Sequence, residues 1–291
     1  MSPLEHWLRE QSRMHRQLYL VLDADGNTEA LLALLNSPPA APHVSLYAGT
    51  EAAPLAARGP FVMQLANRAT PALATLLAHP ERHWGWLASA EGDALAALAR
   101  HWRARMLVGQ SPQRTLYRFH DNRVIARALA HLPEEGLPAY LGPAASLCYW
   151  SEEARQWLAR DNPMPGEHPL PETPAWLAAP QDETTASAML HHNLRFYLLA
   201  RHTAACARQA ERRDFDAWLA EQLRQAREWR WTTPEQLRFW LLERLENDDM
   251  PIPEAWQPRP GETPSAHYER LGYAMSAQSK QLPPSYPDTA E

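Results

Sequence analysis

A proline-rich stretch between residues 160 and 183 sets the strongest limit on how this 291-residue chain can fold. The stretch reads RDNPMPGEHPLPETPAWLAAPQDE and contains six prolines. Proline lacks a backbone N–H and holds the preceding residue in an extended conformation, so neither a helix nor an inner strand can continue through it. We therefore predict a linker or surface strap at 160–183, between a lobe at 1–159 and a second lobe at 184–275, with a disordered tail at 276–291.

Before the prolines, short β-prone runs alternate with helix-like segments. Interleaved strands and helices predict an α/β or α+β lobe with a sheet of about five strands. Some connections are too short for a crossover between parallel neighbours, so we expect a mixed sheet, and the strand order stays open. The runs are LYLVLD at 18–23, HVSLYAG at 43–49, FVMQLA at 61–66, WGWLAS at 84–89 and TLYRFH at 115–120.

After the prolines, the apolar residues follow the 3.6-residue period of amphipathic helices. TTPEQL at 232–237 is a good helix start, since Thr233 can cap, Pro234 suits the first turn and Gln236 completes a capping box. We predict an all-α C-terminal lobe. Its apolar sets are Leu190, Leu194, Tyr197 and Leu198; Phe215, Trp218, Leu219 and Leu223; and Leu237, Trp240, Leu241 and Leu245.

Two tryptophans of this lobe, Trp229 and Trp231, do not fit the helical period. Residues two apart do not share a helix face, so we expect one of them to project toward solvent or a partner. Exposed tryptophan beside arginine is typical of protein interfaces. Packing in the core is an equal alternative for this pair. The candidate partner-binding residues are Trp229, Arg230, Trp231 and Phe239.

Charge and cysteine content exclude several classes of protein. The formal net charge is -6, so the chain lacks the basic character that nucleic acid or an anionic membrane requires, and we expect neither as a partner. The two cysteines, Cys148 and Cys206, form no disulfide framework and no paired metal motif. The first residues lack an apolar signal region, and no run approaches the ~18 apolar residues of a membrane span. We expect a cytoplasmic protein.

The sequence contains no phosphate-binding P-loop, no GxGxxG, no GxSxG and no HExxH. We therefore expect no cofactor, no metal ion and no enzymatic activity. The one polar cluster that suggests chemistry is TLYRFHDNRV at 115–124. We interpret it as a strand-to-helix corner in which Asp121 caps the helix VIARALAHL through the backbone N–H of Arg123 or Val124. The alternative is a hydrolase with a dispersed triad that includes His120 and Asp121.

Taken in order, the runs of the first lobe resemble a known bacterial family over residues 18–145. LYLVLDADGN, VSLYAGTEAAPLAARGPFVMQL, WGWLAS and TLYRFHDNRV, followed by YLGPA, are similar to the domain of unknown function found in type VI secretion effector adaptors, also called effector chaperones. Two departures stand out: Ala24 and Asp25 separate Asp23 from Gly26, and Asn122 replaces the proline of the family pattern. The residues that carry the resemblance are Asp23, Tyr47, Gly49, Gly59, Pro60, Trp84, Gly85, Arg118, Phe119, Asp121, Arg123, Gly142 and Pro143.

The resemblance implies a non-catalytic role in the type VI secretion system. Such adaptors bind a toxic effector in the cytoplasm and promote its loading onto the VgrG or PAAR spike protein. The α/β lobe is then a common scaffold, and the helical lobe contributes much of the cargo surface. Two alternatives stay open beside this expectation: the hydrolase, and a structural subunit that travels with the spike.

Overall fold

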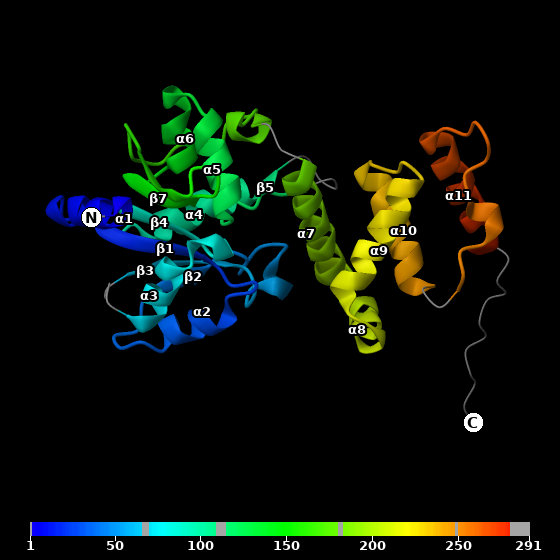
Figure 1. The fold of residues 1–291 in the computed structure, drawn as a ribbon, viewed down its shortest axis with the longest axis horizontal. Coiled ribbons are helices and arrows are strands. Elements are labelled where there is room, and N and C mark those ends of the chain that lie inside the picture. Colours follow the sequence, from blue (N-terminus) through cyan, green and yellow to red (C-terminus); the bar gives the residue numbers. More distant parts are fainter. Residues whose placement is uncertain (1, 66–69, 109–114, 180–182, 248–249, 280–291) are drawn as a thin grey trace. The chain divides into compact units, whose positions relative to one another are not determined.

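The computed structural model describes residues 2–65, 70–108, 115–179, 183–247 and 250–279 (Figure 1). Its contacts divide the chain into two compact units, Met1–Met189 and Leu190–Glu291. The division falls after the predicted linker at 160–183. No helix among the described residues is both long enough and apolar enough to cross a membrane.

The first unit is built on a six-stranded sheet in the order β2-β3-β1-β4-β7-β8. The expected lobe of interleaved strands and helices is confirmed, but its sheet has six strands rather than about five, and every neighbouring pair is antiparallel rather than mixed. The strands are β1 (Gln17–Asp23), β2 (His43–Ser45), β3 (Pro60–Gln64), β4 (Gly85–Ala90), β7 (Ser146–Ser151) and β8 (Gln156–Asp161).

The pairing explains why the sequence pattern looks like an α/β fold. β1 and β2 run in the same direction, as do β3 and β4, because the members of each pair flank a strand of opposite direction. The crossovers therefore join parallel strands that are not neighbours, and the sheet stays antiparallel. The predicted strand at 115–120 is shorter than expected: Thr115–Leu116 (β6) pairs with Leu107–Val108 (β5) in a separate two-stranded sheet, and a turn follows.

Helices cover both faces of the large sheet (Figure 1). Leu18, Leu20 and Leu22 alternate along β1 and pack in the core with α1 (Pro3–Arg13), α2 (Thr28–Leu35) and α3 (Pro71–Ala78). Tyr19 and Val21 face the other way, and the Tyr19 hydroxyl accepts from the N–H of Ala94, just before α4. Strand β1 is consequently buried on both faces. The helices associated with this other face are α4 (Leu95–Met106), α5 (Asn122–His131) and α6 (Leu137–Leu141).

The described part of the proline-rich stretch is held against the first unit. The side-chain amide of Asn162 donates to the carbonyls of Gly142 and Ala144, both at 2.9 Å. Further along, the buried ring of Trp176 lies 5.1 Å from that of Tyr140. Residues 162–179 thus form a strap on the first unit rather than a free tether.

The second unit is all helical, as predicted. Asp214 caps α9 through the N–H of Ala217, and Thr233 and Gln236 form the predicted capping box at the start of α10. The helix α7 begins before the unit boundary, and α11 extends four residues into the predicted disordered tail. The remainder of that tail, 280–291, lies outside the described residues. The helices are α7 (Glu183–Arg201), α8 (Thr203–Arg212), α9 (Phe215–Glu228), α10 (Pro234–Glu246) and α11 (Pro264–Ser279).

Candidate functional site

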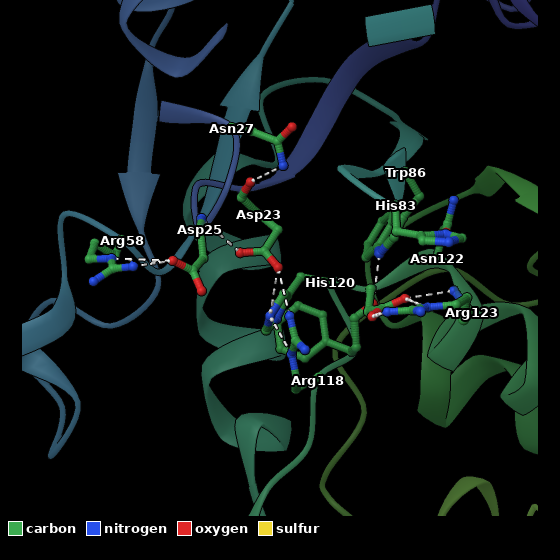
Figure 2. Close-up of polar contacts among 12 residues, drawn as sticks. Asp23, Asp25, Asn27, Arg58, His83, Trp86, Arg118, His120, Asn122 and Arg123 are labelled. Atoms are coloured by element: carbon green, nitrogen blue, oxygen red, sulfur yellow. Dashed lines mark hydrogen bonds and ion pairs between the residues drawn. The ribbon is translucent and has the colours of Figure 1, made fainter. Parts of the chain in front are cut away.

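Several of the residues that carry the family resemblance meet at one buried corner of the first unit (Figure 2). Asp23 comes from the end of β1, and Arg118 and His120 come from the turn before α5. The Asp23 carboxylate accepts from the guanidinium of Arg118 at 2.9 Å, although 95 residues separate them in the sequence. Both side chains are largely buried, with exposed fractions of 8% and 12%. The end of the central strand is thereby tied to the start of α5.

Asp23 also organises the turn that follows its strand. Its Oδ1 accepts from the backbone N–H of Asp25 at 3.1 Å, and its carbonyl accepts from the Asn27 amide at 3.0 Å. The carboxylate of Asp25 in turn pairs with Arg58 at 2.7 Å (Figure 2). The Ala24 and Asp25 that interrupt the family pattern therefore form a turn around Asp23 and leave its side chain in the corner.

Burial dominates the protonation of this carboxyl. Desolvation raises the pKa of Asp23 to about 6, although the charge of Arg118 and the N–H of Asp25 act in the opposite direction. The neighbouring Tyr47 is also buried, and desolvation followed by the Asp23 charge raises the pKa of its phenol. The corner is therefore a low-dielectric site in which the Asp23 carboxyl keeps its proton to a higher pH than usual.

His120 lies inside the same corner rather than on a surface. Its side chain is 1% exposed, and its Nε2 lies 3.6 Å from Asp23 Oδ2 and 3.5 Å from Arg118 Nε. A side chain this deeply buried cannot meet a substrate without movement of the corner. The geometry therefore gives His120 a packing and hydrogen-bonding role among buried charges.

Asp121 is the N-cap of α5, as predicted. Its Oδ1 accepts from the backbone N–H of Arg123 at 3.0 Å, and both carboxylate oxygens accept from the guanidinium of Arg123, at 3.0 and 2.7 Å. Burial alone would raise the pKa of Asp121, but the hydrogen bonds and charge of Arg123 outweigh it and lower the pKa. Asp121 is thus an ionised N-cap whose two carboxylate oxygens both accept from the guanidinium of Arg123.

Asn122 takes the first position of α5, where the family pattern has proline. Its side-chain oxygen lies 2.7 Å from Nδ1 of His83, and its amide donates to the carbonyl of Pro80 at 3.2 Å. Proline at this position would supply a preset backbone angle, whereas asparagine supplies two side-chain contacts to the segment before β4. The departure from the pattern therefore exchanges one way of fixing the corner for another.

Three pattern glycines are required by close approaches: Gly59, Gly85 and Gly142, whose added Cβ would overlap the ring of His101. A Cβ on Gly85 would overlap the carbonyl of Val21 in the neighbouring strand, and Gly85 also has a φ of +140°. A Cβ on Gly59 would overlap the ring of Tyr47. The pattern glycines Gly59 and Gly85 thus permit the tight packing around β1, β3 and Tyr47.

The remaining pattern residues have structural roles in turns, strand ends and the core. Gly49 lies in the turn after Tyr47, Pro60 begins β3, and the buried Trp84 donates its indole N–H to the carbonyl of Leu76. Gly142 accepts from the strap at Asn162 and Gly166, so with Pro143 it belongs to a second anchoring point.

Two aromatic residues outside the family pattern, Trp86 and Trp102, complete the corner. The indole N–H of Trp86 donates to the carbonyl of Phe119 at 2.8 Å, and the ring of Trp102 stacks on Phe119 at 4.4 Å. Trp86 lies within the predicted run 84–89, but no spacing in the sequence indicates its partner. Such contacts between distant segments carry no local signal.

The candidate partner-binding residues of the second unit are mostly in its core. Trp229 and Trp231 are 4% and 1% exposed, so the expectation that one of them projects outward was wrong. Phe239 is half-buried, and of the four candidates Arg230 is exposed. The helical spacing rule fails here because α9 ends at Glu228.

The end of α9 explains how both rings turn inward. Arg230 adopts a left-handed φ of 58°, its N–H donates to the carbonyl of Arg227, and the N–H of Trp231 donates to that of Ala226. This is a Schellman ending, in which glycine is the usual residue at the left-handed position. The reversal brings Trp231 back beside Trp229, with ring centroids 5.3 Å apart.

Within the described ranges, no three His, Cys, Asp or Glu side chains are grouped so that they could hold a metal ion. Hollows do occur on both units. One of about 480 Å³ lies between α5 and the β7–β8 hairpin, and one of about 610 Å³ lies in the second unit among α8, α9 and α10.

Comparison with known proteins identifies one domain. Residues 18–139 match the sequence model of a family described as a domain of unknown function, DUF4123. The matched range contains the buried corner and every predicted pattern residue except Gly142 and Pro143. Neither a search of curated proteins nor a search of solved structures finds a match to the chain. The second unit lies wholly outside the matched range.

Proposed function

We propose that the protein is a non-catalytic adaptor that binds a toxic type VI secretion effector and promotes its loading onto a VgrG or PAAR spike protein. The observation that carries this proposal is the match of residues 18–139 to DUF4123, a domain associated with effector adaptors of this secretion system. The adaptor acts in the cytoplasm, before the effector leaves the cell.

The buried corner supports a scaffold role for the matched domain. Its charged residues form ion pairs with each other: Arg118 with Asp23, and Arg123 with Asp121. Such contacts fix the strand ends and the start of α5, and they offer little to a ligand. The partner-specific surface of the proposed adaptor is therefore sought elsewhere, above all in the second unit.

Co-purification tests the proposal directly. The full chain carrying an affinity tag is expressed together with the spike protein and effector encoded beside its gene, with an unrelated secreted protein of similar size as the control. The adaptor function predicts stable recovery of the neighbouring effector or spike protein and no recovery of the control. The proposal would be refuted if neither the effector nor the spike protein were recovered.

The alternative of a hydrolase depends on His120 and Asp121. The burial of His120 and the capping geometry of Asp121 count against it. If Asp121→Asn abolished a hydrolytic activity while thermal stability stayed unchanged, the enzyme would replace the adaptor. The other alternative, a structural subunit that travels with the spike, predicts the protein in secreted material, whereas an adaptor remains with the cells.

A further inference from the structure

A basic hollow in the second unit is the feature that the buried corner and the matched domain do not explain. It lies among α8, α9 and α10, which pack against one another, and has a volume of about 610 Å³. Four arginines line it, and Glu221 is the one carboxylate among the described lining residues. We call this set the arginine hollow: Arg212 at the end of α8, Arg213 just after it, Arg224 on α9 and Arg244 on α10.

The arginine hollow stands out because the chain as a whole is acidic, with a formal charge of -6. Three separate helical segments contribute a guanidinium, so the local positive charge is a property of the fold rather than of one basic run. Guanidinium groups recognise carboxylates with paired, directional hydrogen bonds, which a diffuse positive surface does not provide. The hollow therefore fits a ligand with more than one carboxylate.

The arginines already have contacts, and two of these are ion pairs that an incoming carboxylate can replace. Arg213 pairs with Glu221 and Arg224 with Glu228, each at 2.7 Å and each between partly or largely exposed side chains. Exposed pairs of this kind contribute about 0–1 kcal/mol, so an incoming carboxylate displaces them at little cost. Arg244 differs, because it is buried and donates to the carbonyl of Met250 at 2.9 Å. It holds the wall of the hollow in place.

That wall is apolar. Met250, which is 62% exposed, lines the hollow together with Pro251 and Ile252. A phosphate chain has no apolar group to pack against this wall. A peptide can place an aliphatic side chain against it while its carboxylates bind the arginines. The combination distinguishes an acidic peptide from a nucleic acid.

We propose that the arginine hollow binds an acidic segment of a partner protein, one in which glutamate or aspartate residues alternate with aliphatic ones. The inference rests on the proposed adaptor function and deepens it, since the partner is then the effector. It assigns recognition of that cargo to residues outside the matched range 18–139.

Fluorescence anisotropy with the full chain tests the inference. The probe is a fluorescein-labelled peptide of alternating glutamate and leucine, and its control has glutamine in place of glutamate. The glutamate peptide is expected to bind at low salt, to bind at least about tenfold more weakly at high salt, and to outcompete the glutamine peptide. Absence of binding, or equal binding of the two peptides, would overturn the inference.

Matched variants locate the site. Arg224→Gln removes a hollow arginine that is 62% exposed and paired with Glu228, whereas Arg208→Gln removes an arginine that is 57% exposed and paired with Glu246 outside the hollow. We expect Arg224→Gln to weaken peptide binding by about threefold to tenfold and Arg208→Gln to leave it unchanged. Combining Arg213→Gln with Arg224→Gln should deepen the loss. Equal losses of peptide affinity for Arg208→Gln and Arg224→Gln would mean that binding depends only on net charge, and would overturn the assignment of the site.

Two further arms separate the other outcomes. A fluorescein-labelled oligothymidine that bound more tightly than the glutamate peptide, and lost affinity in the same variants, would make the hollow a nucleic-acid site and overturn the inference. In the co-purification assay, the double variant is expected to lose the effector that the unmodified chain retains. If the double variant retains it, the adaptor function stands and the arginine hollow is refuted. If the unmodified chain also captures nothing, the adaptor function itself fails.

Discussion

Replacement of Trp231 by alanine decides whether the tryptophan pair belongs to the core or to an interface. The ring is 1% exposed and contacts four other rings, those of Trp229, Phe239, His267 and Tyr268, at centroid distances of 5.3, 6.1, 5.0 and 5.7 Å. Truncation of a fully buried tryptophan costs roughly 3–5 kcal/mol, from lost burial and the cavity left behind. We expect Trp231→Ala to lower the free energy of unfolding of the second unit by that amount.

Trp231→Phe is the matched control, because it keeps an aromatic ring in the cluster. The indole N–H of Trp231 has no hydrogen-bond partner among the described residues, so phenylalanine removes a buried donor that contributes nothing. We expect Trp231→Phe to cost less than half as much as Trp231→Ala. Urea unfolding of the full chain, followed by circular dichroism and with the two units fitted as separate transitions, measures both. Native stability in Trp231→Ala, combined with weaker binding of the effector, would return the pair to an interface role.

Three further predictions concern the corner and the end of α9. Asp121→Ala loses the cap of α5 and the ion pair with Arg123, so it should lower the free energy of unfolding in urea by about 1–2 kcal/mol. Asp121→Asn keeps the cap and should lose less stability, and equal losses for the two variants would contradict the capping role. Burial raises the pKa of Asp23 to about 6, so its contribution to stability is fully present below about pH 4 and is lost as pH rises through 6. Asp23→Asn should remove roughly 3 kcal/mol of this pH dependence, measured by urea unfolding between about pH 4 and 7. Identical pH profiles for the variant and the unmodified protein would refute the assignment. Arg230→Gly should raise stability by about 0.5–1 kcal/mol, since glycine adopts the left-handed φ of 58° without strain, and a lower melting temperature would contradict the Schellman ending.

The sequence predicts those elements whose signals are local. The runs at 18–23, 61–66 and 84–89 became β1, β3 and β4, and the capping residues Asp121 and Thr233 stand where their side-chain chemistry predicts. Each of these signals lies within about seven residues of chain. Strand direction and order depend on pairing between distant segments, which no local pattern records, and the sheet was mispredicted for that reason.

Two segments show how local patterns mislead. β7 and β8, with the sequences SLCYWS and QWLARD, form a hairpin that the sequence analysis did not identify. In TLYRFH the strand ends at Leu116, and Tyr117 and Phe119 belong to the segment that turns toward α5, where Phe119 stacks on Trp102. Hydropathy alone cannot tell a strand from a buried turn.

The tryptophan pair was misjudged for a different reason. The spacing rule applies inside a helix, and the helix stops two residues before Arg230. Glycine would have indicated this stop, but here an arginine takes the left-handed conformation. A non-glycine residue in that conformation is uncommon enough that the sequence offers no warning.

The placement of the pattern residues limits what the resemblance can say about function. Asp23, Arg118 and Asp121 fix a buried corner, and side chains buried in this way do not touch a partner. Under the proposed function, the match over 18–139 corresponds to a scaffold, and we look for the residues that select the cargo among exposed side chains. The second unit lies outside the match and carries the arginine hollow, so under the proposed function we expect changes there to alter effector binding without unfolding the first unit. Corner variants should do the reverse: they lower stability first, and lose every partner together.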